Sequence, residues 1–337
     1  MRRGSIVQLV ALGVVIGAAA TLVALLVPWL PPNASEERDG IDLVFWFTTA
    51  ICIGIFALVG AVILYAVVKF RVRPDDDSDG PPVHGHTGIE IAWTAVPAIL
   101  VTAISVISGI VLVENDHAAS GHLNVTVTAR QFAWTFTYPD QGNVTSSTLR
   151  LPLKRSVELH LQALDVIHSF WVPEFGQKQD AVPGQDTQLV VTPTKVGTYP
   201  VICTELCGLG HALMRTSAVV MEPKAWQTWI ADEKRGLTAP PGEAGKSVFA
   251  ANGCASCHTL EAAGATGKVG PDLDKLPADA QKAGEPLEDY TRESIVDPNA
   301  YVVPGYQKNV MPPFNTLPKD QLDALVTFLV DSSKEAK

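Results

Sequence analysis

Basic residues are scarce relative to acidic ones, and long parts of the chain lack charge of either sign. Lysine and arginine number 25 against 35 aspartates and glutamates, a formal net charge of −10 over 337 residues. We therefore expect no nucleic-acid partner, because nucleic-acid binding generally relies on a basic face. An acidic surface suits a basic protein partner instead, because opposite charges raise the rate of encounter.

Three stretches in the first third of the chain are almost free of charge. Residues 6–30 contain no charged residue, residues 41–68 carry only Asp42, and residues 89–113 carry only Glu90. Each stretch exceeds the roughly 20 apolar residues that a helix needs to cross a bilayer. The alternative for the last two is a buried core helix, but soluble helices seldom stay apolar on every face over such lengths. We predict a transmembrane helical hairpin over residues 36–115.

The first apolar stretch admits two interpretations. Arg2 and Arg3 precede it, as basic residues precede the apolar part of a signal peptide. The stretch is long, however, and no clear small-x-small cleavage site closes it. Residues 1–35 are therefore predicted to be either a signal peptide or a first transmembrane helix.

The orientation of the hairpin does not depend on that choice. The polar segment 74–88 is predicted to be the loop between its two helices. Three basic residues mark the cytoplasmic side by the positive-inside rule: Lys69, Arg71 and Arg73. The third stretch then leads outward, and we expect the chain after about Glu114 to lie on the outer face.

Beyond Glu114 the pattern changes to the two-residue period of β-strands. The candidates are separated by Gly, Pro and Asp turns and cover residues 124–128, 132–138, 156–161, 187–191 and 197–202. Such spacing predicts a small antiparallel sandwich or barrel over residues 116–225.

The last part of the chain is predicted to be helical. The sequence turns helical around Pro223 and loosens at residues 236–245, so residues 226–241 are predicted to be a linker to a final domain, 242–337. Amphipathic stretches open and close this domain. The closing one has four apolar residues on one helical face: Leu322, Leu325, Val326 and Leu329.

Cysteine is rare, with five residues in the chain. Cys52 lies in an apolar stretch, and the other four form two short-spaced pairs in the part predicted to face an oxidising compartment. Disulfides are the usual expectation there. A histidine accompanies each pair, which indicates cofactor attachment instead.

The first pair belongs to a dense set of metal-binding residue types. Cys203, Cys207, His211 and Met214 fall within twelve residues between two predicted strands. Thiolate, imidazole and thioether together favour copper, whereas a structural zinc site would more often use Cys and His alone. Two thiolates four residues apart can both bridge a pair of metals.

A second imidazole should come from elsewhere in the domain. The candidates within this domain are His117, His122, His160 and His168. His160 lies inside an alternating strand, which is typical of a partly exposed strand residue. His168 lies in the more distinctive segment 165–173, Asp-Val-Ile-His-Ser-Phe-Trp-Val-Pro.

The second pair, in Cys254-Ala-Ser-Cys257-His258, matches the attachment signature of c-type haem. Half a zinc ribbon or a redox disulfide can match it too. No cysteine follows Cys257, so the second half of a zinc ribbon is missing. No histidine follows His258, so ligation of the haem iron by two histidines within the domain is excluded as well. Met311 is the one methionine that follows, and His/Met ligation raises the potential of a haem that carries electrons.

The segment from Asp165 and the pattern Cys-x-Glu-x-Cys-Gly-x-x-His-x-x-Met from Cys203 resemble subunit II of cytochrome c oxidases. The resemblance implies a cupredoxin-like domain with two copper ions, the CuA centre. The implied ligands are the bridging thiolates of Cys203 and Cys207, the imidazoles of His168 and His211, the thioether of Met214 and the backbone carbonyl of Glu205. The Glu205 side chain would also reach a magnesium ion shared with subunit I.

Residues 242–331 are similar to class I cytochrome c, in the helix before the motif, in Gly270-Pro-Asp-Leu after it, and in Met-Pro-Pro-Phe before a terminal helix. This resemblance implies an all-α domain with one covalent haem c on Cys254 and Cys257 and the axial ligands His258 and Met311.

Two further positions take a role from the resemblance. Glu90, at the cytoplasmic edge of the third apolar stretch, matches a glutamate near the mouth of a proton-uptake channel of subunit I; a solvated helix-end carboxylate is the alternative. In Arg130-Gln-Phe132-Ala-Trp134, oxidases fed by a separate cytochrome c usually have Trp as the electron-entry residue where this chain has Phe132. Phe132 and Trp134 are the electron-entry candidates.

These observations predict a multidomain protein of the bacterial cell (inner) membrane: a multi-pass helical part, an all-β copper domain and an all-α cytochrome domain, the last two on the outer face. The expected function is electron relay from a donor (cytochrome c or a cytochrome bc-type complex) through haem c and CuA to subunit I. Subunit I would reduce oxygen and pump protons, with subunit III and membrane lipid as further partners.

Other proteins share part of this pattern. The electron-entry subunit of a CuA-type nitric oxide reductase would carry the same motifs. A quinol oxidase subunit would lack the copper ligands, and a membrane-tethered copper carrier would not need a covalent haem.

Overall fold

The computed structural model describes residues 3–71, 82, 84–237, 241–315 and 317–335. Arg73, most of the predicted hairpin loop and residues 238–240 of the predicted linker lie outside them. The chain divides into a membrane unit (1–33 and 38–115) and a second unit (34–37 and 116–337). Each unit is described by itself.

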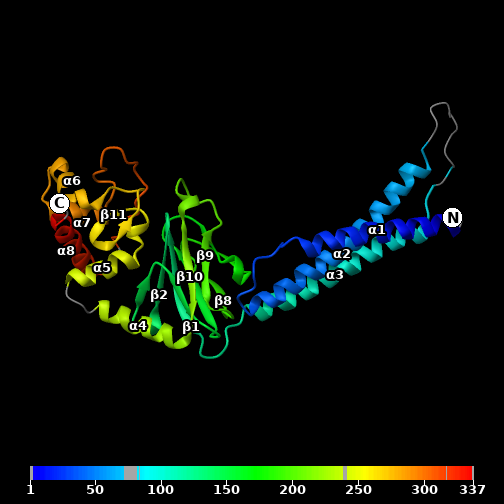
Figure 1. Cartoon of the computed structure of the whole chain (residues 1–337), viewed down its shortest axis with the longest axis horizontal. Helices are drawn as coiled ribbons and strands as arrows, with labels where there is room; N and C mark the ends of the chain where they lie inside the picture. Colours follow the sequence, from blue (N-terminus) through cyan, green and yellow to red (C-terminus); the bar gives the residue numbers. More distant parts are fainter. Residues whose placement is uncertain (1–2, 72–81, 83, 238–240, 316, 336–337) are drawn as a thin grey trace. The chain divides into compact units, whose positions relative to one another are not determined.

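The membrane unit consists of long apolar helices (Figure 1). Among the described residues, three are long and apolar enough to cross a membrane: α1 (Arg3–Leu26), α2 (Glu37–Lys69) and α3 (Thr87–Asn115). The helices approach closely at small residues. A β-carbon built on Gly17 would lie 3.5 Å from the Ala57 Cβ, and one built on Gly40 would lie 2.8 Å from the Val111 side chain. The two helices of the predicted hairpin are confirmed, and the first stretch is also a long apolar helix, as either of its two interpretations allows.

The second unit begins with two packed five-stranded sheets. The first has the order β3-β2-β1-β5-β8, with bounds Val144–Ser146, Ala133–Tyr138, Leu123–Arg130, Val157–Ala163 and Thr187–Val191. The second has the order β4-β10-β9-β6-β7, with bounds Leu149–Pro152, Arg215–Met221, Gly197–Cys203, His168–Trp171 and Lys178–Ala181. The predicted sandwich is present, but it is not purely antiparallel, because β1 pairs with β5 and β4 with β10 in parallel.

Alternating side chains of the strands fill the space between the sheets. In β1 every second residue from Leu123 to Ala129 is fully buried, as the two-residue period predicts. Tyr138 is buried as well, and its hydroxyl donates to the Arg150 carbonyl at 2.9 Å. The core extends to helix α4 (Pro223–Leu237), where the Trp226 indole donates to the same carbonyl at 3.0 Å. Most of the predicted linker therefore forms a helix that packs on the sandwich.

The last domain has a separate apolar core. Its helices are α5 (Pro241–Ala251), α6 (Leu276–Ala283), α7 (Leu287–Val296) and α8 (Lys319–Glu335), and a two-stranded ribbon pairs β11 (Thr259–Leu260) with β12 (Ala265–Thr266). The predicted face of α8 is buried at Leu325, Val326 and Leu329. Helices α5 and α8 cross in close contact at Gly245, where an added Cβ would lie 2.1 Å from the Ala324 carbonyl oxygen.

Candidate metal centres

The predicted copper ligands come from the ends of neighbouring strands. Cys203 is the last residue of β9, and the loop to β10 carries Cys207, His211 and Met214. His168 is the first residue of β6, which pairs with β9 through Phe170 and Cys203. This pairing brings an imidazole 35 residues away in sequence to the cysteine loop.

The ligand atoms meet in one cluster around the two thiols. The Cys203 Sγ lies 3.9 Å from the Cys207 Sγ, 3.9 Å from the His168 Nδ1 and 3.3 Å from the Glu205 carbonyl oxygen. The Cys207 Sγ lies 3.5 Å from the His211 Nδ1 and 3.8 Å from the Met214 Sδ. All six residues predicted from the sequence are therefore brought together.

The cluster fits soft metal ions. Both cysteines are free and buried, and their sulfurs are too far apart for a disulfide bond. Metal–thiolate bonds of about 2.3 Å, as for zinc, allow two sulfurs at this separation to share one ion. Sulfur and imidazole donors match copper, and the buried thioether of Met214 matches copper better than zinc.

Two residues outside the ligand set orient it. The His168 Nε2 lies 2.8 Å from an Asp165 carboxylate oxygen, which leaves Nδ1 to face the thiols. The other Asp165 oxygen accepts the Gln131 backbone N–H at 2.7 Å, and the Gln131 side-chain amide donates to the Cys207 carbonyl. Sequence reasoning missed both roles. The three-residue spacing from Asp165 to His168 was the available signal.

The same contacts shift the pKa values of the cluster. Burial acts to lower the pKa of His168, but Asp165 and Cys203 outweigh it and raise that pKa to about 9. Burial acts to raise the pKa of Cys203, but hydrogen bonds, that from His168 first, lower it to about 6. Burial and the neighbouring Cys203 charge raise the pKa of Cys207. Because metals bind the thiolate form of cysteine, metal binding here is coupled to loss of protons from the thiol pair.

The other candidate histidines do not join the cluster. The His122 Nε2 lies 3.1 Å from a Glu158 carboxylate oxygen, and the His160 Nδ1 lies 3.2 Å from Asp186. Both are partly exposed on the sheet of β1 and β5, in agreement with the interpretation of His160 as a strand residue.

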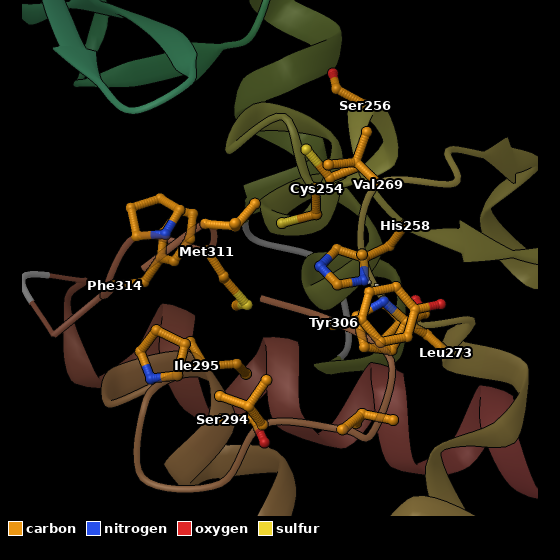
Figure 2. A pocket seen from close by; sticks show the side chains of 18 of the residues that line it. Cys254, Ser256, His258, Val269, Leu273, Ser294, Ile295, Tyr306, Met311 and Phe314 are labelled. Atoms are coloured by element: carbon orange, nitrogen blue, oxygen red, sulfur yellow. Dashed lines mark hydrogen bonds between the residues drawn. The ribbon is translucent and has the colours of Figure 1, made fainter. Parts of the chain in front are cut away.

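A largely apolar cavity of about 450 Å³ is lined mostly by the last domain and partly by residues of the sandwich, Phe132 among them. Figure 2 shows His258 and Met311 pointing into it from opposite sides, with Cys254 beside them. Cys257 also lines the cavity. The predicted attachment cysteines and axial ligands therefore share one pocket.

Local backbone geometry sets the direction of the His258 ring. Its Nδ1 lies 2.8 Å from the Pro271 carbonyl oxygen, which leaves Nε2 free to bind a metal. A β-carbon on Gly270 would lie 2.4 Å from the ring, so any larger residue there would displace the imidazole. Burial lowers the pKa of His258 and so favours the neutral ring that binds iron. The cavity, the thiols and this ring fit a haem.

The remaining candidates occupy different settings. A Glu90 carboxylate oxygen accepts the His86 backbone N–H at 3.1 Å, at the first turn of α3. Trp134 is buried and packs edge-on against the His168 ring at 6.2 Å, so its indole is part of the core around the copper cluster. Phe132 is partly buried and lines the haem cavity.

Comparison with known proteins agrees with this geometry. Residues 21–110 match the family "Cytochrome C oxidase subunit II, transmembrane domain", residues 144–222 match its periplasmic domain, and residues 242–333 match "Cytochrome c". The chain is 32% identical to cytochrome c oxidase subunit 2 of Synechocystis sp., over 68% of this chain and 82% of that protein. The chain belongs to the cytochrome c oxidase subunit II family.

Other relatives of the family differ in how much they share. Cytochrome c oxidase subunit 2 of Alkalihalophilus pseudofirmus is 31% identical, over 88% of this chain and 87% of the relative. The crystal structure of the periplasmic domain of subunit II from Bradyrhizobium japonicum aligns with 35% of this chain and 98% of its own, at 27% identity and a TM-score of 0.34.

As a cytochrome c oxidase subunit II, the chain combines membrane helices, a cupredoxin-like domain and a C-terminal cytochrome c domain. It is a membrane protein and a subunit of an enzyme, and these domains imply copper and haem c as cofactors and subunit I as a partner.

Proposed function

We propose that the chain is the electron-entry subunit of a haem-copper cytochrome c oxidase that receives electrons at its own haem c domain. The observation that carries this proposal is a copper-binding cluster and a haem-binding cavity on one polypeptide. In the cluster two free thiols lie 3.9 Å apart, with the His168 ring 3.9 Å from the Cys203 Sγ and the His211 ring 3.5 Å from the Cys207 Sγ. The cavity is lined by His258 and Met311.

Each part of the chain has a defined task in this proposal. Two copper ions would be held by Cys203, Cys207, His168, His211, Met214 and the Glu205 carbonyl. The haem would be held covalently by Cys254 and Cys257, and its iron would be bound by His258 and Met311. When bound, these groups supply one-electron chemistry that leads from the donor (cytochrome c or a cytochrome bc-type complex) to subunit I, where oxygen is reduced and protons are pumped.

The protein contributes burial and fixed geometry. Buried ligands and the Asp165 bond to His168 limit how far the copper cluster can rearrange, which suits a centre that must change charge with little movement. The largely apolar lining of the cavity beside His258 lowers the local polarity and so helps set the potential of a haem.

Other proposals concern the surroundings of the chain. The exposed Glu205 side chain binds a magnesium ion shared with subunit I. The chain lies in the bacterial inner membrane with its copper and haem domains on the outer face, in contact with lipid and subunit III.

Glu90 is proposed to lie at a proton-uptake entrance of subunit I. Glu90→Ala should then lower the turnover of the complex, measured as oxygen uptake. Glu114→Ala, near the opposite end of α3, is the matched control and should leave turnover unchanged. Equal rates for both variants would reduce Glu90 to a helix-end carboxylate.

The decisive experiment is purification of the complex through a tag on this chain, followed by electron paramagnetic resonance, haem spectra and oxygen uptake. We expect a paired-copper signal, one c-type haem, haem a bands and oxygen reduction. Zinc or a single copper would contradict the copper assignment. Haem b without haem a, with nitric oxide as substrate, would instead identify a nitric oxide reductase.

A further inference from the structure

One side chain of the copper domain reaches into the haem domain. Arg130, the last residue of β1, is buried. Its Nη2 lies 3.5 Å from the Thr135 hydroxyl in its own domain and 3.5 Å from the Asn252 side-chain oxygen, just after α5. Its Nε is buried and has no hydrogen-bond partner among the described residues. The guanidinium therefore contacts both its own sandwich and the haem domain.

The ring beneath Arg130 belongs to the haem site. The guanidinium carbon lies 4.2 Å from the centre of the Phe314 ring, which is buried and lines the haem cavity. Phe314 follows the ligand Met311 by three residues. Arginine stacks well on an aromatic face because its guanidinium is planar and weakly hydrated. The contact therefore joins β1 to the segment that carries an axial ligand.

A second contact lies two residues further along. The Phe132 ring lies on the copper-ligand loop so closely that a β-carbon on Gly210 would come within 2.4 Å of it, and one on Gly208 within 3.2 Å. Gly208 follows Cys207, and Gly210 precedes His211. The same ring lines the haem cavity, as do Gly210 and Leu213. One aromatic side chain thus touches both the copper loop and the haem pocket.

We propose that Arg130 and Phe132 form a built-in seat for the haem domain. Arg130 is the positioning residue that holds Phe314, and Phe132 is the contact that joins the haem cavity to the copper-ligand loop. This inference rests on the proposed function, because it concerns the two centres named there.

The chemistry of Phe132 suits a permanent seat. A separate donor must dock and leave, whereas a domain on the same chain can keep the contact covered. A phenyl ring has no polar atom, so covering it permanently leaves no hydrogen-bonding group without a partner, whereas covering an indole N–H without a partner costs free energy.

The seat can be tested by the spread of distances between the domains in the whole oxidase complex. The copper pair is paramagnetic when oxidised, and a nitroxide on Glu288→Cys, an exposed position of α7, gives the second spin. Cys52→Ser removes the exposed native thiol. We expect a single narrow distance distribution by dipolar electron paramagnetic resonance. A broad distribution in this spin-labelled protein, with Arg130, Phe132 and Phe314 all unchanged, would overturn the proposal.

Arg130→Ala should broaden that distribution several-fold and slow electron transfer from the photoreduced haem to the copper pair. Arg155→Ala is the matched control, because that guanidinium donates to the Gly121 carbonyl within its own domain. The control should keep the narrow distribution. An unchanged distribution in Arg130→Ala would overturn the proposal.

A second variant distinguishes loss of the Arg130–Phe314 contact from a folding defect caused by Arg130→Ala. Phe314→Leu removes the ring of the same contact from the other side, and it should reproduce the broadening with the copper signal intact. A narrow distribution in Phe314→Leu would contradict the seat. The proposed function fails if the unsubstituted complex lacks the paired-copper signal or the c-type haem. If both are present and only the distance distribution is broad, the proposed function stands and the seat alone is wrong.

Discussion

At the scale of single residues, both centres depend on hydrogen bonds to atoms that do not bind the metal. Asp165 accepts from His168 in the copper cluster, and the Pro271 carbonyl accepts from His258 in the haem cavity. Each bond selects which ring nitrogen faces the metal, so the tautomer is determined by the fold.

Asp165→Asn should weaken copper binding by about 10–100-fold, because it removes the carboxylate that orients His168. Competition with a copper chelator measures this. Asp186→Asn is the matched control, since Asp186 also binds a histidine, His160, that lies outside the cluster. Equal copper retention in both variants would show that the Asp165 bond is dispensable.

Gly270→Ala should displace His258, because the new methyl group would lie 2.4 Å from the imidazole ring. We expect loss of the low-spin His/Met haem spectrum and lower haem content, measured by absorption spectra. Gly242→Ala, where an added Cβ meets no atom within 4 Å, serves as the control. A normal spectrum in Gly270→Ala would contradict the assigned direction of the ring.

At the scale of secondary-structure elements, the first and last helices of the haem domain, α5 and α8, cross and pack against each other. Gly245 allows the two backbones to approach, and Phe249 packs edge-on against Phe328 at 6.1 Å beside it. The ligand segment with Met311 precedes α8, so this crossing also limits where that segment can lie.

Gly245→Ala should destabilise the haem domain by about 1–3 kcal/mol, because the new methyl group overlaps the Ala324 carbonyl and forces the helices apart. Thermal unfolding followed by haem absorbance measures the change. Gly242→Ala in the same helix should leave the midpoint unchanged or slightly higher, since alanine favours the helix. Matching midpoints for both variants would mean that α5 and α8 do not touch at Gly245.

At the scale of the whole molecule, the copper and haem ligands belong to separate apolar cores. The sandwich core includes Cys203 and Cys207, and the helical core includes the partly buried Cys254 and Met311. Because the two sets of ligands lie in separate clusters of buried residues, we expect the two cofactors to load independently.

The double variant Cys254→Ala/Cys257→Ala should lose c-type haem and keep the paired-copper signal. The converse variant, Cys207→Ser, should lose the paired-copper signal and keep the haem. Electron paramagnetic resonance and haem spectra of the purified chain measure both. Loss of copper from the haem-free variant would show that the two cores fold as one.

Spacing between residues close in the sequence was sufficient to predict most of the copper and haem ligands. Cys203 to Met214 form one contiguous loop and Cys254 to His258 one turn, so covalent connection already brings most ligands within reach. Membrane-spanning helices also follow from composition, because a bilayer imposes a length and an apolar surface on each.

Other features depend on pairing between distant segments. The approach of His168 to Cys203 requires the pairing of β6 with β9, and Asp165, Gln131 and Arg130 acquire their contacts from folding. The parallel pairing of β1 with β5 was not predicted either, because alternation reports which face a strand buries and not the direction of its neighbour. Residue types and spacings thus determine which cofactors can bind, and tertiary packing decides how their ligands are oriented and which surfaces meet.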